Sequence, residues 1–311
     1  MATYYGTYGQ KVQYLASDPT SPQNGQVWFN STSNLLKVGI QQTDAWATGG
    51  NLTNATANNA GAGTQTAALS IGGYPTLNFT EEYNGTSWSP GGNLGTARGA
   101  LNGAGTQTTA VAFGGDTAPG NQTEEYDGTS WTAGGNLGTA RQFLAGAGTQ
   151  TSALAFGGSG PGTATEEYNG TSWTAGGNLG TGRQYLWGCG LQTTALAFGG
   201  SASPGNQTEE YDGTSWTAGG NLGTGRQFIS GCGTQTAALA FGAYPPSNIT
   251  ELYDGTSWTA GGNLATARGA LAGAGTQTAG LAIGGLTAVP VTNTEEFTGG
   301  STVVAKTVTG T

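Results

Sequence analysis

Residues 98–137 read RGALNGAGTQTTAVAFGGDTAPGNQTEEYDGTSWTAGGNL, and close variants of this stretch recur along most of the 311-residue chain. The block GGNL starts at positions 49, 91, 134, 176, 219 and 261, in steps of 42 or 43 residues. The blocks GTQT (once GLQT) and EEY (once ELY, once EEF) also occur six times each, at nearly the same spacing. Six copies of one unit therefore make up the body of the chain.

Each unit is predicted to contain four short strands. In the quoted copy these are the small-residue segment 99–105, the apolar segment 108–113, residues 123–126, and residues 130–133. Asp127-Gly128 is a tight turn that favours a hairpin, because Gly accepts a positive φ. About forty residues with four strands is the period of a propeller blade, so the sequence predicts an all-β, six-bladed β-propeller.

The order of residues within the unit resembles the kelch repeat. That repeat has an Arg, an apolar strand closed by Gly-Gly, a Tyr and then a Trp, here Arg98, Gly114-Gly115, Tyr126 and Trp131. The resemblance covers about residues 46–297. It implies a kelch-type propeller and does not by itself imply a function.

Two segments compete to supply the strand that closes the ring. The last copy has Glu295-Glu296-Phe297 but no GTSW after it, and an orphan Trp46 precedes the first GGNL. We expect Thr43–Leu52 to provide the outer strand of the sixth blade, which removes a free sheet edge. The alternative is the segment Ser301–Thr309.

Most charged residues are predicted to form structural ion pairs. All five arginines occupy one position of the repeat, where the first copy has Thr56, and a Glu-Glu pair occupies another. Adjacent strand residues face opposite ways, so one Glu of a pair is expected to point between blades, as with Glu124 and Glu125 beside Arg141, while its neighbour faces solvent. The residues assigned to these pairs are Arg98, Arg141, Arg183, Arg226, Arg268, Glu124, Glu125, Glu166, Glu167, Glu209 and Glu210.

The composition argues against several kinds of chemistry. The chain has no His, which excludes the copper site of kelch-like oxidases, Ser-His-Asp triads and His-based zinc sites. The Glu-Glu pairs recur around the ring, so none stands out as a glycoside-hydrolase site. We therefore expect no enzyme, no catalytic residue, no metal and no cofactor. A net charge of −9 without a Lys/Arg cluster argues against nucleic-acid binding, and no apolar run is long enough for membrane insertion.

The only two cysteines, Cys189 and Cys232, occupy matching positions of neighbouring blades where other blades have Ala. We expect both to be buried and to pack as small hydrophobic residues. A disulfide across the channel wall is the alternative.

The copies differ most in two regions: the loop after Gly-Gly, and the residues just after the Arg position. Both emerge at the same end of a four-stranded blade and are expected to meet at the channel mouth. Three consecutive blades place a Gln and an aromatic residue there, which suits a sugar with hydroxyls to bond and C–H faces to stack; alternatively, the rings fill gaps between blades. The predicted glycan or receptor site is Gln142, Phe143, Gln184, Tyr185, Trp187, Gln227, Phe228 and Tyr244.

Residues 1–43 do not follow the repeat. Within them Val27–Phe29 and Leu35–Val38 are predicted to pair as a hairpin. A short motif in this region resembles an element of structural proteins from tailed bacteriophages. Its parts are Asn24-Gly25-Gln26, Trp28-Phe29, Asn30-Ser31-Thr32, Leu36-Lys37-Val38 and Trp46.

This resemblance, with the Gly- and Thr-rich repeats, implies a virion protein. We expect a non-enzymatic tail-fibre, tail-tip or surface-appendage protein that binds a host-surface glycan or receptor through the propeller face. The alternative is a structural capsid or tail decoration or spacer without a ligand, and a cellular kelch adaptor is a weaker third choice.

The expected organisation has three parts. Residues 1–43 attach to other virion proteins as a homo-oligomer on the particle, residues 44–300 form the propeller, and residues 301–311 form a C-terminal strand or tail. The N-terminus lacks the apolar segment of a signal peptide, which agrees with assembly in the host cytoplasm.

Overall fold

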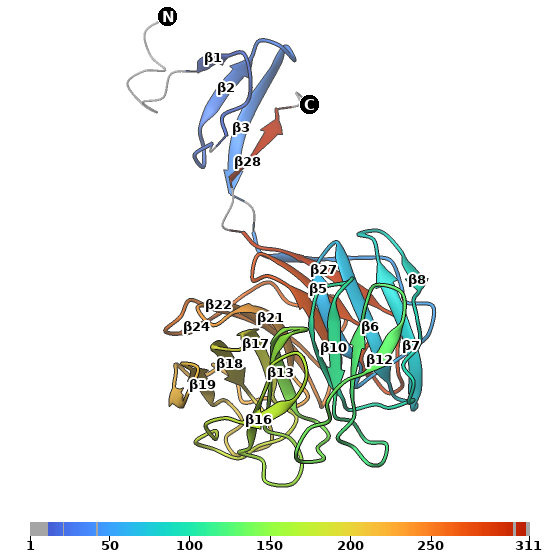
Figure 1. Cartoon of the computed structure of the whole chain (residues 1–311). Helices are drawn as coiled ribbons and strands as arrows, with labels where there is room; N and C mark the ends of the chain where they lie inside the picture. The colour runs from blue at the N-terminus through green and yellow to red at the C-terminus, as the bar shows by residue number, and fades with distance from the viewer. Residues whose placement is uncertain (1–11, 21, 42, 301–302, 309–311) are drawn as a thin grey trace, which may run out of the picture. The chain divides into compact units, whose positions relative to one another are not determined.

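The computed structural model describes residues 12–20, 22–41, 43–300 and 303–308. The chain forms two compact units, Ala45–Phe297 and a smaller one that joins Met1–Asp44 to Thr298–Thr311 (Figure 1). The larger unit contains six four-stranded sheets, and the smaller unit contains a seventh. No helix in the described part of the chain is long and apolar enough to cross a membrane.

In the larger unit each sheet is one blade of a six-bladed β-propeller, as predicted. Blades 1 to 3 consist of β5 (Ala60–Thr64), β6 (Ala67–Gly73), β7 (Leu77–Tyr83) and β8 (Trp88–Pro90); β9 (Asn102–Gly105), β10 (Ala110–Phe113), β11 (Thr123–Tyr126) and β12 (Trp131–Ala133); and β13 (Ala145–Thr149), β14 (Ser152–Phe156), β15 (Thr165–Tyr168) and β16 (Trp173–Ala175). Blades 4 to 6 consist of β17 (Trp187–Leu191), β18 (Thr194–Phe198), β19 (Thr208–Tyr211) and β20 (Trp216–Ala218); β21 (Ser230–Thr234), β22 (Ala237–Ala243), β23 (Ser247–Tyr253) and β24 (Trp258–Ala260); and β25 (Ala272–Gly275), β26 (Ala279–Ile283), β27 (Thr294–Thr298) and β4 (Ala45–Thr48).

The first strand of every blade lines a central channel. These strands contact one another around the whole ring, including β25 of blade 6 against β5 of blade 1. Their alternate glycines allow this close approach. A Cβ added at Gly273 of β25, for example, would lie 2.3 Å from the backbone carbonyl oxygen of Gly231 on β21 in the preceding blade.

The ring is closed by the N-terminal strand β4, which is the outer strand of blade 6 beside β27. Trp46 on β4 lies against Phe241 and Phe297, with ring centroids 4.9 and 5.1 Å apart. Its indole N–H donates a hydrogen bond of 3.0 Å to the hydroxyl of Thr250 in blade 5. Of the two candidate segments, the structure uses the N-terminal one.

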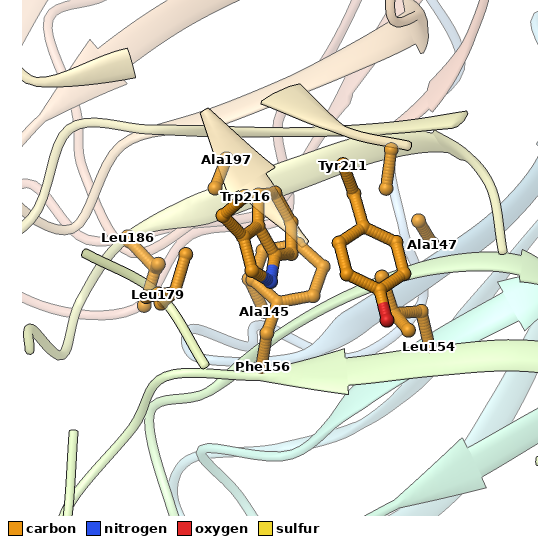
Figure 2. Close-up of a cluster of buried hydrophobic side chains, with 10 residues drawn as sticks. Ala145, Ala147, Leu154, Phe156, Leu179, Leu186, Ala197, Tyr211 and Trp216 are labelled. Atoms are coloured by element: carbon orange, nitrogen blue, oxygen red, sulfur yellow. The ribbon is translucent and has the colours of Figure 1, made fainter. Parts of the chain in front are cut away.

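The hydrophobic core lies between blades, because each sheet has a neighbour on both faces. Figure 2 shows the cluster between blades 3 and 4, where Leu154 and Phe156 of blade 3 meet Tyr211 and Trp216 of blade 4. These four side chains are at most 9% exposed. Each blade therefore depends on both neighbours for burial of its apolar side chains.

The smaller unit combines strands from both ends of the sequence. It contains β1 (Gln13–Leu15), β2 (Val27–Asn30), β3 (Leu35–Gln41) and β28 (Val303–Thr307), in that order across the sheet. The predicted hairpin is present as β2 and β3, with Val27 opposite Val38. The sequence predicted a C-terminal strand or tail separate from residues 1–43. Instead, the C-terminal strand β28 pairs antiparallel with β3 of the N-terminal segment.

Candidate functional site

One end of the channel is formed by six residues with left-handed backbone. Each stands two positions after the Arg position of its copy, and the φ angles lie between 51° and 60°. This conformation is uncommon for residues other than Gly, so the surrounding structure has to hold it. The six residues are Asn58, Ala100, Phe143, Tyr185, Phe228 and Ala270.

A closed circle of backbone hydrogen bonds holds these six residues in place. The N–H of each donates to the carbonyl of the equivalent residue in the preceding blade, over 2.7–3.1 Å. The circle closes where the N–H of Asn58 in blade 1 donates to the carbonyl of Ala270 in blade 6. We call this circle the mouth ring. It fixes the three aromatic members at one height around the channel.

The aromatic members of the mouth ring pack on one another. Tyr185 is stacked on Phe228 with centroids 3.9 Å apart, and Phe143 lies 4.5 Å from Tyr185. Tyr244, from the loop after β22, continues the series with its ring 6.0 Å from Phe228. The three ring members are half-buried, whereas Tyr244 is 41% exposed. The structure thus brings four of the predicted site residues together.

Trp187 lies inside the channel, two residues beyond the mouth ring. The other five blades have Ala, Asn or Ser at this position of the first strand. Trp187 packs against the core of blades 4 and 5 and also against the cluster that includes Ala272, which blades 6 and 1 form. The single large side chain of Trp187 therefore fills the channel at the level where the other five blades have small side chains. The cavity below the mouth ring is only about 40 Å³, which is too small for a sugar residue.

The three glutamines lie between the mouth ring and the loops after Gly-Gly. The N–H groups of Gln142 and Gln184 donate to the hydroxyls of Ser159 and Ser201, over 3.1 and 3.3 Å. Their carbonyls accept 2.9 Å bonds from the N–H groups of the same two serines. The carbonyl of Gln227 accepts the N–H of Tyr244 in the same way. The two variable regions of the repeat therefore meet at one end of the channel, as expected.

The five arginines form buried ion pairs, and the partner of Arg141 differs from the one expected. Each pairs with the first Glu on the third strand of its own blade, so Arg141 pairs with Glu166 at 2.8 Å. Burial lowers the pKa of the Arg141 guanidinium from its ordinary value, and Glu166 opposes that shift. The expected pairing of Arg141 with Glu124 is wrong, because Glu124 belongs to the preceding blade. The observed pairs are Arg98–Glu124, Arg141–Glu166, Arg183–Glu209, Arg226–Glu251 and Arg268–Glu295.

The second Glu of each pair is half-buried, and none makes an ion pair with another described residue. Glu125, Glu167 and Glu210 accept hydrogen bonds from the hydroxyls of Tyr168, Tyr211 and Tyr253 in the next blade. Their assignment to ion pairs is therefore wrong. Strand alternation turns the second Glu to the other face of its sheet, but in a propeller a neighbouring blade covers that face too.

Blade 1 has no arginine at the Arg position, and an amide side chain contacts its first Glu instead. Glu81 accepts hydrogen bonds from the backbone N–H groups of Thr53 and Asn54, over 2.7 and 3.0 Å. The side-chain amide of Asn54 donates a third bond of 3.2 Å. Thr56, at the Arg position, instead donates its hydroxyl to the carbonyl of Gly72.

Both cysteines are free and buried. The Cys232 thiol lies 3.3 Å from the carbonyl of Thr276 in the next blade, and burial raises the pKa of this thiol to about 12. A thiol with such a pKa is a poor nucleophile at neutral pH. Among the described residues, no group of three or more acidic, His or Cys side chains is placed to hold a metal ion.

Comparison with known proteins identifies the fold. No protein-family model matches the sequence, and no curated protein matches it. The solved structure of YjhT, a kelch-repeat β-propeller, superposes with a TM-score of 0.68 at 14% sequence identity. The match covers 82% of this chain and 99% of that one. The fold is that of a kelch-type β-propeller. At this identity the similarity establishes the architecture alone.

Sequence comparison among the copies could find only part of the mouth ring. Phe143, Tyr185 and Phe228 stand out because they are large, whereas Asn58, Ala100 and Ala270 carry no sign of their left-handed backbone. The serines that hold the glutamines were also missed. Nothing in the sequence distinguishes Ser159 and Ser201 from the other small residues of their loops.

Proposed function

We propose that this protein is a non-enzymatic virion appendage protein of a tailed bacteriophage, and that the mouth end of its propeller binds a glycan or receptor on the host surface. The observation that carries the binding role is the continuous series of rings Phe143, Tyr185, Phe228 and Tyr244. Aromatic rings beside uncharged hydrogen-bonding groups suit the apolar faces and hydroxyls of sugars. The phage setting rests on the sequence resemblance in the N-terminal region.

The surroundings of the rings favour an uncharged ligand surface. The six loops after Gly-Gly contain one charged side chain, Asp116, which accepts a 2.7 Å bond from the N–H of Gly99. The arginines near the mouth are buried and paired with glutamates. The mouth end is thus nearly neutral in a protein whose net charge is −9.

A second function is a decoration or spacer protein without a ligand. The stacking of Tyr185 on Phe228 favours this role, because two rings whose centroids are 3.9 Å apart already cover much of each other's apolar surface. In that case the three aromatic members of the mouth ring serve mainly to fill the end of the channel.

The smaller unit is the proposed attachment segment to other virion proteins. Its described residues include apolar side chains that remain in water, among them Tyr14 at 77%, Ile40 at 44% and Val308 at 46% exposure. A sheet of four short strands buries little apolar surface by itself. Contact with a partner or a second copy of the chain would cover these side chains, which is why we propose a homo-oligomer on the particle.

The test is binding of the fluorescently labelled protein to candidate host cells, with soluble surface polysaccharide as competitor. The variant Phe228→Ala is well suited, because Ala100 and Ala270 already occupy this position with the same backbone in two other blades. We expect saturable binding that weakens in Phe228→Ala and Tyr244→Ala. The matched control is Leu191→Thr, at the far end of the channel strand, where the other five copies have Thr. Absence of binding to any host cell would favour the spacer role.

A further inference from the structure

Three side-chain amides beside the mouth ring have no partner in the described part of the protein. Gln142, Gln184 and Gln227 are half-buried, and the backbone carbonyl of each accepts a hydrogen bond from the loop of its own blade. No hydrogen bond joins any of the three side-chain amides to another described residue. A carboxamide both donates and accepts, and leaving it unpaired in a half-buried place costs free energy unless water or a ligand bonds to it.

Each of the three glutamines lines its own cavity between two blades. The cavity with Gln227 lies between the loops of blades 4 and 5 and measures about 420 Å³. The cavity with Gln184 lies between blades 3 and 4 and measures about 370 Å³, and that with Gln142 lies between blades 2 and 3 and measures about 220 Å³. The two larger cavities fall in the range of ordinary small-molecule sites.

The three cavities follow one another without a gap. Ser159 lines both the Gln142 and the Gln184 cavities, and Ser201 lines both the Gln184 and the Gln227 cavities. The repeat thus produces an arc of three equivalent cavities that share walls. The arc ends at Tyr244, which lines the largest cavity and also contacts the mouth-ring residue Phe228.

The chemistry of the cavities is uncharged. Each is lined by one glutamine, by serine or threonine, and by glycine and proline of the loops. Each also contains a buried arginine whose charge is balanced by its own glutamate. Among the described residues that line these cavities, Asp116 in the smallest one is the only carboxylate. Neither a phosphate nor a carboxylate of a ligand would meet an unpaired cation there.

We propose that the arc is an extended binding site for an uncharged glycan chain, with one sugar unit in each cavity and Gln142, Gln184 and Gln227 as the repeated hydrogen-bonding groups. This rests on the proposed function and deepens it, because it moves the polar contacts from the mouth ring to the cavities outside it. Tyr244 stacks on the sugar unit in the Gln227 cavity. Since the sites are equivalent and adjacent, the affinity of a chain exceeds that of a single sugar through its additional contacts.

The test uses size-fractionated neutral polysaccharides, namely dextran, mannan and galactan, with the acidic polymer alginate as comparison. We expect at least one neutral polymer to bind, with an affinity that rises from monosaccharide to oligosaccharide. Gln142→Ala, Gln184→Ala and Gln227→Ala should each weaken binding about threefold to tenfold. The triple variant should abolish it. Ala is compatible with this position because blade 1 has Ala57 there.

Controls separate loss of contacts from loss of fold. Leu191→Thr should bind like the unsubstituted protein, and all variants should keep their thermal unfolding midpoint. Gln227→Glu keeps the shape of the side chain but loses the N–H donors, so it should weaken binding as Gln227→Ala does. Preference for alginate, equal binding by the triple variant, or an affinity independent of chain length would each overturn the proposal.

Failure of this inference can be distinguished from failure of the proposed function. If the protein binds host cells but no neutral polymer binds it or competes, the arc is not the site and the binding role stands. If host cells are not bound either, both proposals fail together.

Discussion

At the scale of single residues, the interfaces between neighbouring blades, here called seams, share one hydrogen bond. Five of the six seams have this bond, and the sixth lacks it. Five tyrosines donate their hydroxyls to the second Glu of the preceding blade, as Tyr126 does to Glu82 over 2.6 Å. At the sixth seam the acceptor position holds Leu252 and the donor position holds Phe297. These two side chains pack in the same hydrophobic cluster. The hydroxyl and its acceptor are thus replaced together, so neither is left unpaired.

This matched exchange predicts a non-additive pair of substitutions. Phe297→Tyr alone buries a hydroxyl against Leu252 and should lower the free energy of unfolding by about 1–3 kcal/mol. Leu252→Glu alone also leaves a half-buried carboxylate without a partner. Together they recreate the bond of the other five seams, so the double variant should be more stable than the sum of the single effects. Urea unfolding of the four proteins measures the coupling, and strict additivity would refute it.

The seam tyrosines also predict a loss of stability at high pH. Burial, reinforced by the bonded glutamate, raises the pKa of each of these five phenols to about 12, against an ordinary value of about 10. Above pH 10 the unfolded chain loses these protons while the folded protein keeps them. The stabilisation is therefore complete below about pH 10 and is lost as the pH rises toward 12.

Denaturant unfolding measured from pH 8 to 12 checks this dependence. The midpoint should fall with a slope that becomes shallower in Tyr253→Phe, which has one phenol fewer. A midpoint that stays constant across the range would contradict the shared role of the five seams.

At the scale of the strand, each blade is joined to the one before it by the same side chains. The Gln of the GTQT turn donates to two backbone carbonyls of the preceding blade, as Gln150 does to Ala110 and Tyr126 over 3.0 and 2.7 Å. The Trp of the outer strand donates to a Thr of the preceding blade, as Trp216 does to Thr165 over 2.9 Å. Both contacts complete a circle of six, with Trp46 of β4 as the sixth Trp.

Because these contacts are equivalent, the same substitution at two of these tryptophans should lower the free energy of unfolding by the same amount. Trp46→Phe and Trp258→Phe each keep most of the apolar surface but lose an indole N–H bond to a Thr of the preceding blade. Each should lower the free energy of unfolding by about 1–2 kcal/mol. Chemical denaturation of the two variants provides the comparison. If Trp46→Phe had no effect, β4 would not be an equal member of its blade.

At the scale of the whole molecule, closure by β4 makes all six blades mutually dependent. The residues that close the ring, 45–48, belong to the larger unit, although they precede the first complete repeat. Because the core lies between blades, an open seam exposes two apolar faces at once. The propeller is therefore expected to unfold as one cooperative unit.

Two fragments test this dependence. Residues 45–297 retain all six blades and should fold with a thermal midpoint close to that of the full chain. Residues 49–297 lack β4 and with it Trp46, whose loss costs about 3–5 kcal/mol, so their midpoint should be roughly 10 °C lower. Circular dichroism during heating measures both. Equal midpoints would show that β4 does not contribute to closure.

The sequence alone was sufficient for everything that depends on local pattern. The period, the number of blades, the four strands of each blade and the tight turns were predictable, because each copy repeats the same short-range signals. The internal comparison of copies also located the variable end of the propeller. Phe143, Tyr185 and Phe228 were found there because they are large residues at positions where other copies have small ones.

Only the tertiary structure decided which residue each repeated side chain contacts. Glu125 bonds to Tyr168 rather than to an arginine, Trp187 fills the channel below the mouth ring, and β28 pairs with β3. These contacts join residues that are far apart in the sequence, and the pattern of one strand does not reveal what covers its second face. The sequence determined the blade, and the packing of each blade between two others determined what every repeated residue contacts.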